Sequence, residues 1–254
     1  MISETLYASG GRQWTFFGRD PNKQSELIDT NTYLVTHGKA GVVLDPGGLE
    51  TFPEIVSAIS KKIDLQDIHA LFASHQDPDI ISSLSLWMEL CGDIKVYASW
   101  VWGSFIPHFG GGRSITTIPD EGGVMELGGS RDLRFVPAHY LHSSGNFCLY
   151  DPMAKILFSG DIGAALLPEG HRGVFVQNFE EHTRYMEGFH RRWMPSNQAK
   201  NEWIAHVSQL EIDMMCPQHG SIFRGDQVRR FLDWFRALEV GSAAGVNGGP
   251  RRGR

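Results

Sequence analysis

The first hundred residues alternate between short hydrophobic runs and amphipathic stretches. Residues 32–48 predict two strands joined by a turn at 36–41, the first with alternating apolar positions and the second a buried apolar run. Apolar residues then recur at spacings of three and four over 51–63. Because Thr51 and Pro53 suit the beginning of a helix, this stretch predicts one.

The same rhythm continues to residue 99. The apolar run at 68–75 predicts a strand that ends at a histidine, and 94–99 predicts another strand. Between them, 79–92 predicts one helix that ends at Gly92. A strand–helix–strand–helix–strand order is typical of α/β layered domains.

The second half of the chain begins with strands and finishes mainly with helices. Residues 123–161 predict a series of short strands separated by Gly, Asp and Pro turns. Helical spacing returns over 178–194 and 197–210, a strand is predicted at 212–220, and 226–239 predicts a closing amphipathic helix.

Composition favours a single domain. The chain has 254 residues, of which 41% are hydrophobic and 20% charged, so it can build one large core. We find no linker that divides the chain, and we therefore expect one domain over 1–238. Residues 239–254 are rich in Gly and Arg without apolar periodicity, and they predict a disordered tail.

Charge and targeting signals narrow the class of protein. The net charge is −6 and the pI is near 6.0, so no global basic field attracts nucleic acid or anionic membrane. No run of about 18 apolar residues is present, and the N-terminus does not resemble a signal peptide. Three scattered cysteines are too few for a disulfide framework. We expect a cytoplasmic protein without a nucleic-acid or membrane partner.

Candidate chemistry collects where predicted strands end. Six side chains lie at such places: His75, Asp77, Asp79, His142, Asp161 and His219. Polar side chains at the ends of neighbouring strands converge on one edge of a sheet, where α/β proteins place their sites. Three imidazoles and three carboxylates form a mixed nitrogen and oxygen set, which suits iron, manganese or zinc. We assign no catalytic residue apart from these candidate metal ligands.

Some of these assignments have alternatives. In an extended loop alternate residues point the same way, so His75, Asp77 and Asp79 in the motif SHQDPDI face one cavity. The two aspartates fit equally well as caps of the following helix, because its free N–H groups stabilise acids at its start. His139 is the rival of His142, and a strand running through both would point them to opposite faces.

Together the motifs resemble the metallo-β-lactamase superfamily and, within it, the flavodiiron proteins. The matching segments are SHQDPDI, LHSSGNF with His142, LFSGD with Asp161, and CPQHGSIFRG with His219. They span nearly the whole catalytic domain of that family, and they favour His142 over His139. The combined pattern is far more specific than any one segment.

The resemblance implies a four-layer αββα sandwich that holds two iron ions. It also implies a division of the ligands: His75, Asp77 and His142 for the first ion, Asp79 and His219 for the second, and Asp161 as a bridge. Asp77 stands where flavodiiron proteins usually have Glu, and Ile80 stands where zinc hydrolases of the superfamily have His. Losing imidazoles makes the site harder, which favours iron over zinc. A dinuclear hydrolase that uses a metal-bound hydroxide is the alternative function.

The resemblance also bears on electron supply and partners. Flavodiiron proteins append a flavodoxin domain that binds FMN, but no Gly-rich phosphate loop follows residue 240, so we expect no FMN in this chain. The chain looks like the stand-alone oxygen-binding diiron proteins. That implies a non-haem diiron protein that binds O2 or NO, as a sensor, a carrier or a slow reductase with an external electron donor. A redox or signalling partner and a homodimer are compatible with this, but the sequence identifies neither.

Other conspicuous residues are given structural interpretations. His182 and His190 lie on predicted helices beside Arg and Glu, and we expect them on a polar helix face, with a place behind the metal ligands as the alternative. An aromatic cluster is expected to lie in the core, with a wall over the metals as the alternative: Trp100, Trp102 and Phe105. The Gly-rich segment 109–113 and the loop 163–174 are candidate mobile covers of the site.

Overall fold

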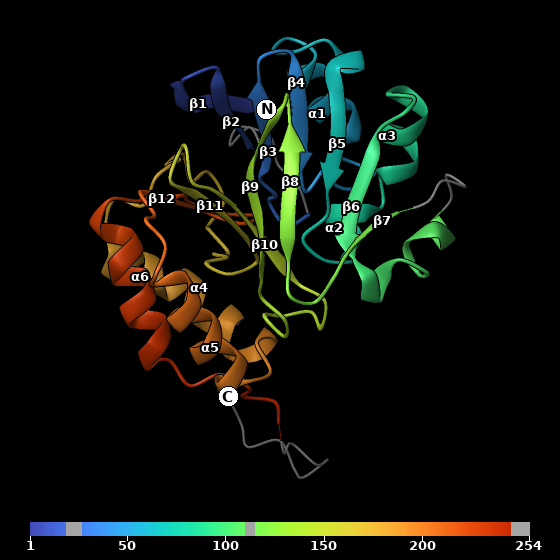
Figure 1. Ribbon diagram of the computed structural model, residues 1–254. Helices are drawn as coiled ribbons and strands as arrows, with labels where there is room; N and C mark the ends of the chain where they lie inside the picture. Colours follow the sequence, from blue (N-terminus) through green and yellow to red (C-terminus); the bar gives the residue numbers. More distant parts are fainter. Residues whose placement is uncertain (19–26, 110–114, 245–254) are drawn as a thin grey trace.

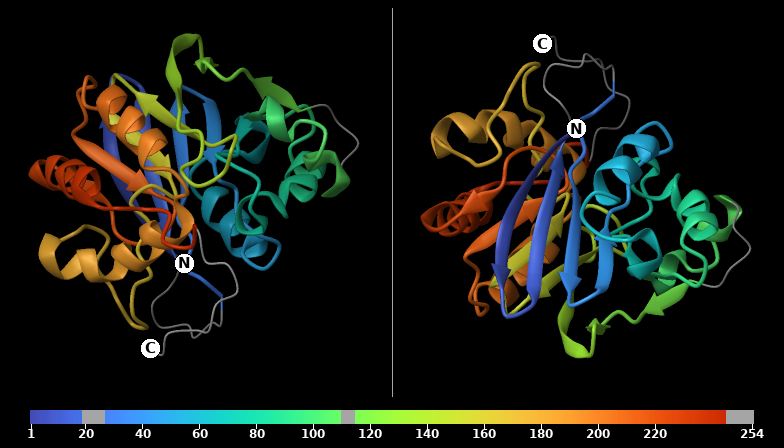
Figure 2. Two further views of the ribbon diagram at one scale, coloured as in Figure 1. Left: turned by 90° about the horizontal axis from the view of Figure 1, so that it is seen from below. Right: turned by 90° about the horizontal axis from the view of Figure 1, so that it is seen from above.

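Two β-sheets face each other, and helices cover the outer face of each (Figures 1 and 2). The structure is a computed structural model, and it describes residues 1–18, 27–109 and 115–244, without the side chains of 109 and 130–132. The predicted four-layer αββα sandwich is confirmed.

The first sheet combines an antiparallel and a parallel part. Within the described residues it has seven strands in the order β1 (Ile2–Ser9), β2 (Arg12–Gly18), β3 (Thr32–His37), β4 (Ala40–Leu44), β5 (Ile68–Phe72), β6 (Lys95–Ser99) and β7 (Thr116–Ile118). Neighbours are antiparallel from β1 to β4 and parallel from β4 to β7.

The second sheet is antiparallel except for one pair. In the described part of the chain its order is β13 (Phe223–Arg224), β12 (Met214–Pro217), β11 (Ile156–Gly160), β10 (Phe147–Asp151), β9 (Ser130–Pro137) and β8 (Gly123–Leu127). The parallel pair is β11 with β12. The site is formed by the loops that follow the parallel strands β4 and β5 of one sheet and β11 and β12 of the other, together with the loop between β9 and β10.

Six α-helices are assigned over the described ranges: α1 (Phe52–Ile59), α2 (Pro78–Ile81), α3 (Leu84–Leu90), α4 (Phe179–Trp193), α5 (Asn197–Val207) and α6 (Asp226–Ala237). The first three pack on the first sheet and the last three on the second. Short 3-10 turns lie at Leu65–Asp67, Trp100–Trp102 and Ile106–Phe109.

Three apolar layers hold the sandwich together. One lies between the two sheets, and one lies under each group of helices. Adjacent residues of a strand serve different layers: Val42 and Leu44 face the second sheet, whereas Val43 packs with Ile55 of α1. All four are essentially inaccessible to solvent. Strands buried on both faces explain why the predicted strand over this stretch is a continuous apolar run.

The N-terminal hairpin of β1 and β2 was not predicted from the sequence. Most side chains of β1 lie at the sheet's edge and are exposed, so this strand carries little apolar patterning. The hairpin is attached to the other sheet by polar contacts. Arg12 Nη1 lies 3.2 Å from Asp151 Oδ2, and Trp14 Nε1 donates a hydrogen bond to the same oxygen at 2.7 Å.

The single helix predicted over 79–92 is wrong, because α2 and α3 are separate. Two serine hydroxyls at the break compete with helical hydrogen bonds. Ser82 Oγ donates to Pro78 O at 2.6 Å, and Ser83 Oγ donates to Gly47 O at 2.5 Å. The break keeps α2 short and leaves Asp79 in its first turn.

Two structural interpretations of side chains also prove wrong. His182 and His190 are buried and do not lie on a polar helix face, since α4 turns both rings toward the second sheet and α6. In the aromatic cluster, Trp100 and Phe105 are 54% and 61% exposed. Trp102 is partly buried.

The C-terminal segment begins in contact with the domain. Val240 is buried, its N–H donates to Asn197 Oδ1, and the N–H of Ser242 donates to Arg191 O. Residues 245–254 of the predicted tail, and most of the Gly-rich segment 109–113, lie outside the described residues. In the ranges that are described, no helix is long and apolar enough to cross a membrane.

Candidate metal centre

The six candidate ligands come from loops at one edge of the sandwich. His75, Asp77 and Asp79 follow β5, and His142 lies in the loop between β9 and β10. Asp161 and His219 follow the parallel strands β11 and β12. Parallel strands end at the same edge of a sheet, so the register of β11 with β12 brings these two residues together.

One half of the site is compact. His142 Nε2 lies 3.3 Å from Asp77 Oδ2 and 3.0 Å from Asp161 Oδ2. His75 Nε2 lies 3.6 Å from each of the same two oxygens. The ligand atoms of these four residues all lie within 4.8 Å of one another. Atoms that share a cation at about 2.1 Å lie roughly 3.0–3.4 Å apart, so this spacing suits one ion.

The other half of the site is built on the opposite oxygen of Asp161. His219 Nε2 lies 3.4 Å from Asp161 Oδ1 and 3.4 Å from Asp79 Oδ2. Asp161 therefore presents Oδ2 to the first half, formed by His75, Asp77 and His142, and Oδ1 to the second half, formed by Asp79 and His219. A carboxylate placed between two cations has this orientation.

The alternatives left by the sequence can now be compared with the geometry. Asp77 occupies the N-cap position of α2, but its side chain makes no capping hydrogen bond and points to the histidines. His142 reaches the site, whereas His139 Nε2 bonds to Asp120 O at 2.8 Å. Ile80 is fully buried in the apolar layer under the helices and offers no ligand atom.

Hydrogen bonds outside the ligand set fix two of the imidazole rings. Ser74 Oγ donates to Asp45 Oδ2 at 2.7 Å, so its oxygen accepts from the Nδ1–H of His75 at 2.9 Å. The Nδ1–H of His219 donates to Asp29 O at 2.7 Å. Each ring therefore turns Nε2 toward the site, the nitrogen through which such a histidine binds a metal once its proton is displaced. Sequence reasoning missed these supports, although Asp45 directly follows a buried strand in the segment GVVLDPG.

The electrostatics of the site favour a cation. Burial opposes charge on Asp161, but the imidazoles of His75, His142 and His219 outweigh it and hold the pKa of Asp161 well below its usual value. Burial also lowers the pKa of His219, yet Asp161 and Asp79 raise it to about 9. The carboxylates likewise raise the pKa of His75 well above its usual value. Carboxylates that hold protons on nearby imidazoles this strongly also attract metal ions.

Two buried atoms support the same conclusion. His75 Nε2 and Asp161 Oδ1 are inaccessible to solvent, and neither has a hydrogen-bond partner within the described residues. Buried polar atoms are nearly always satisfied, so atoms without a hydrogen bond in both halves of a cluster of ligands need an explanation. A cation bound by both halves satisfies them. The residues present therefore fit a metal pair.

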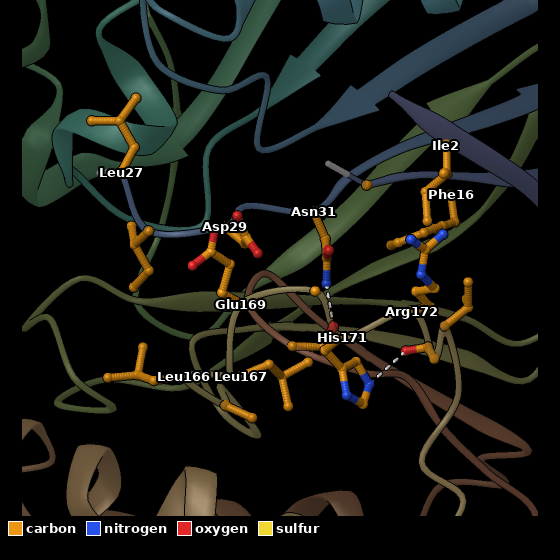
Figure 3. A pocket seen from close by; sticks show the side chains of 17 residues that line it. Ile2, Phe16, Leu27, Asp29, Asn31, Leu166, Leu167, Glu169, His171 and Arg172 are labelled. Carbon is orange, nitrogen blue, oxygen red and sulfur yellow. Dashed lines mark hydrogen bonds between the residues drawn. The ribbon is translucent and has the colours of Figure 1, made fainter. Parts of the chain in front are cut away.

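Aromatic side chains and a cavity border the site on different sides. Trp193 is 52% exposed, and its ring lies 5.4 Å from that of His142 and stacks on Phe189 at 5.7 Å. A cavity of about 990 Å³ lies between the loops that carry Leu27 and Leu166 (Figure 3). Its wall includes Asp29, whose carbonyl supports His219.

Solved structures show the same fold with related centres. The chemotaxis sensor ODP from T. denticola, in its apo state, is 37% identical, with a TM-score of 0.86 over 96% of this chain and 97% of that one. A structure described as the peroxy diiron species of chemotaxis sensor ODP has the same identity and a TM-score of 0.84. A flavo di-iron protein variant from Thermotoga maritima is 25% identical, with a TM-score of 0.78 over 92% of this chain and 60% of that chain.

Sequence comparison agrees with the structural one. An uncharacterised protein of Methanocaldococcus jannaschii is 24% identical over 80% of this chain. The match covers 52% of that protein, so the chain spans about half the length of this curated relative. The family model described as ODP family beta lactamase matches residues 28–220. The resemblance to metallo-β-lactamase and flavodiiron proteins is confirmed, and the chain belongs to the ODP family of β-lactamase-like proteins.

Proposed function

We propose that this chain is a non-haem diiron protein that binds O2, or NO, and acts as a cytoplasmic sensor that reports to a signalling partner. The observation that carries the proposal is the placement of Asp161, whose two oxygens face the two halves of the site. In the proposed assignment His75, Asp77 and His142 hold one iron, Asp79 and His219 hold the other, and Asp161 bridges them.

The chain's own residues support holding a ligand over reducing it rapidly. Ferrous ions in this site would supply open positions for a diatomic ligand. His75 and His219 direct their N–H groups away from the site, toward Ser74 and Asp29, so neither donates a proton to a bound ligand. The rings of Phe189 and Trp193 lie 6.4 Å and 5.4 Å from that of His142 and add apolar surface there. Slow protonation favours a long-lived complex.

The similar proteins support the sensing role. The structures at 37% identity are described as a chemotaxis sensor, and one of them as a peroxy diiron species. A slow reductase with an external electron donor is the neighbouring alternative. The hydrolase alternative receives no support from the site, because Ile80 is buried and position 77 carries a carboxylate.

The test combines metal analysis with optical and Mössbauer spectroscopy. We expect two irons per chain after anaerobic reconstitution, with Mössbauer parameters of a coupled pair. Addition of O2 to the reduced protein should produce a visible charge-transfer band that persists for minutes. Two irons without any such band would overturn the oxygen-binding role, and two zinc ions in unsupplemented protein would restore the hydrolase alternative.

A further inference from the structure

Two glutamines lie beside the ligand histidines, but their amide groups reach the aspartates. Gln76 follows His75 in the chain, and its Nε2 donates to Asp77 Oδ1 at 3.1 Å. Gln218 precedes His219, and its Nε2 donates to Asp79 Oδ2 at 3.2 Å. Each half of the site therefore has one carboxylate that is held by one glutamine amide.

The amide of Gln76 is fixed at both ends. Its Oε1 accepts a hydrogen bond from Ser143 Oγ at 2.6 Å, and Ser143 directly follows His142. Gln76 Nε2 donates its hydrogen bond to Oδ1 of Asp77, so Oδ2 is the oxygen that faces His75 and His142. The hydrogen bonds from Ser143 to Gln76 and from Gln76 to Asp77 thus determine which oxygen of Asp77 faces the histidines of the first half of the site.

Gln218 is held even more firmly, by its own backbone. Its carbonyl accepts from Asn31 N at 2.6 Å, its N–H donates to Gly160 O at 2.8 Å, and the residue is 1% exposed. Its Oε1 is buried without a hydrogen-bond partner among the described residues. Burying an unpaired amide oxygen is unfavourable, and the hydrogen bond from Nε2 to Asp79 is the one that the side chain makes among the described residues.

Asp79 has more need of such support than Asp77. It lies in the first turn of a four-residue helix, and its side chain is 29% exposed. A carboxylate at that place samples several rotamers unless a neighbour holds it. The donor from Gln218 keeps Oδ2 beside His219 across a sequence separation of 139 residues.

We infer that Gln76 and Gln218 are positioning residues, each of which fixes the carboxylate of one half of the site and thereby sets the affinity of that half for its ion. This inference rests on the proposed diiron function. Both amides are neutral donors, so they orient the carboxylates without cancelling the negative charge that the ions require.

The test is a titration of apo-protein with Co2+, whose visible d–d bands report on each ion without any reaction with O2. We expect Gln218→Met to lower the affinity for one of two ions by about 10–100-fold and to leave the other unchanged. In an Asp79→Asn background, Gln218→Met should have no further effect. Gln76→Met should lower the affinity for the other ion, which is the one that the Asp79→Asn variant still binds.

The matched control is Gln198→Met. Gln198 Nε2 donates to Glu202 Oε1 at 2.8 Å, and both residues are exposed on α5, so the substitution removes the same type of hydrogen bond away from the site. This variant should bind both ions with wild-type affinity. If Gln218→Met does not fold by circular dichroism, Gln218→Asn replaces it, because the shorter side chain keeps a polar group but cannot reach Asp79.

Two outcomes would overturn the inference: wild-type affinity for both ions in the Gln76 and Gln218 variants, or equal weakening of both ions in each variant. A wild-type protein that takes up fewer than two cobalt or iron ions would instead contradict the proposed function. The wild-type titration therefore separates the two failures before any variant is measured.

Discussion

Asp45 accepts two hydrogen bonds from Ser74, one from the backbone N–H at 2.8 Å and one from the hydroxyl at 2.7 Å. The residues are 29 positions apart, at the ends of the parallel strands β4 and β5. Burial raises the pKa of Asp45 to about 7, although Ser74 and His75 oppose the shift. The pair connects a buried carboxyl group to His75 and orients that ring.

Removal of the hydroxyl should weaken the metal site. Ser74→Ala leaves His75 Nδ1 and Asp45 without their shared partner, so we expect the affinity for iron or cobalt to fall about 10–100-fold. The free energy of unfolding of the apo-protein should fall by about 1–3 kcal/mol, because buried polar groups lose a hydrogen bond. Metal titration and urea unfolding measure the two effects. Ser60→Ala is the control, since its exposed hydroxyl donates to Ser57 O, away from the site.

Trp193 should report on metal binding. Its ring lies 5.4 Å from that of His142. Fe2+ or Co2+ quenches nearby fluorophores, so metal loading should quench the tryptophan fluorescence. Trp193→Phe should remove more than one seventh of that quenching, which is the fraction expected if all seven tryptophans contributed equally. Trp100→Phe serves as the comparison. Equal losses in both variants would contradict the placement of Trp193 beside the site.

His182 should make the fold sensitive to acid. Burial, with the neighbouring His171 and His190, lowers its pKa from 6.5 to about 4. The unfolded chain therefore binds this proton before the folded chain does. The stabilisation is complete above pH 6.5 and is lost as the pH falls toward 4, by at most about 3 kcal/mol.

The measurement is the free energy of unfolding of the apo-protein between pH 7 and pH 4. His182→Phe keeps an apolar ring against Phe223, whose ring lies 5.4 Å away, and removes the proton site. We expect a shallower loss of stability in this variant over that range. His206→Phe, on α5 and exposed, should retain the wild-type slope. Parallel slopes in wild type and His182→Phe would rule out this role.

The buried ion pair between the two sheets should contribute strongly to stability. Arg12 and Asp151 are both fully buried at 3.2 Å, and Trp14 Nε1 also donates to Asp151. Asp151→Ala removes the carboxylate that Arg12 and Trp14 share in a buried place, and we expect a loss of about 3–5 kcal/mol by chemical denaturation. Asp233→Ala removes the exposed partner of Arg236 at 2.9 Å and should cost less than about 1 kcal/mol. Similar losses in the two variants would show that burial does not matter here.

The fold was largely predictable because most of its elements carry local patterns. Val42 to Leu44 form a continuous apolar run, and α4 and α6 have the spacing of amphipathic helices. The prediction failed where an element has no apolar pattern of its own, or where tertiary hydrogen bonds oppose the pattern. The edge strand β1 buries little, and the helical pattern breaks at Ser82 and Ser83, whose hydroxyls bond to Leu49 N and Gly47 O in another segment.

The sequence alone determined which chemical groups gather at the site, since their positions after strands follow from local patterns and from the family resemblance. It also indicated one layered domain, because a strand's pattern depends on its neighbours in the chain. Tertiary structure decided how those groups are used. The Ser74–Asp45 and His219–Asp29 hydrogen bonds, across sequence separations of 29 and 190, set the imidazole tautomers of His75 and His219. The Gln218–Asp79 hydrogen bond, across a separation of 139, sets the orientation of Asp79. Such contacts depend on how the two sheets and their loops pack, and no local pattern encodes them.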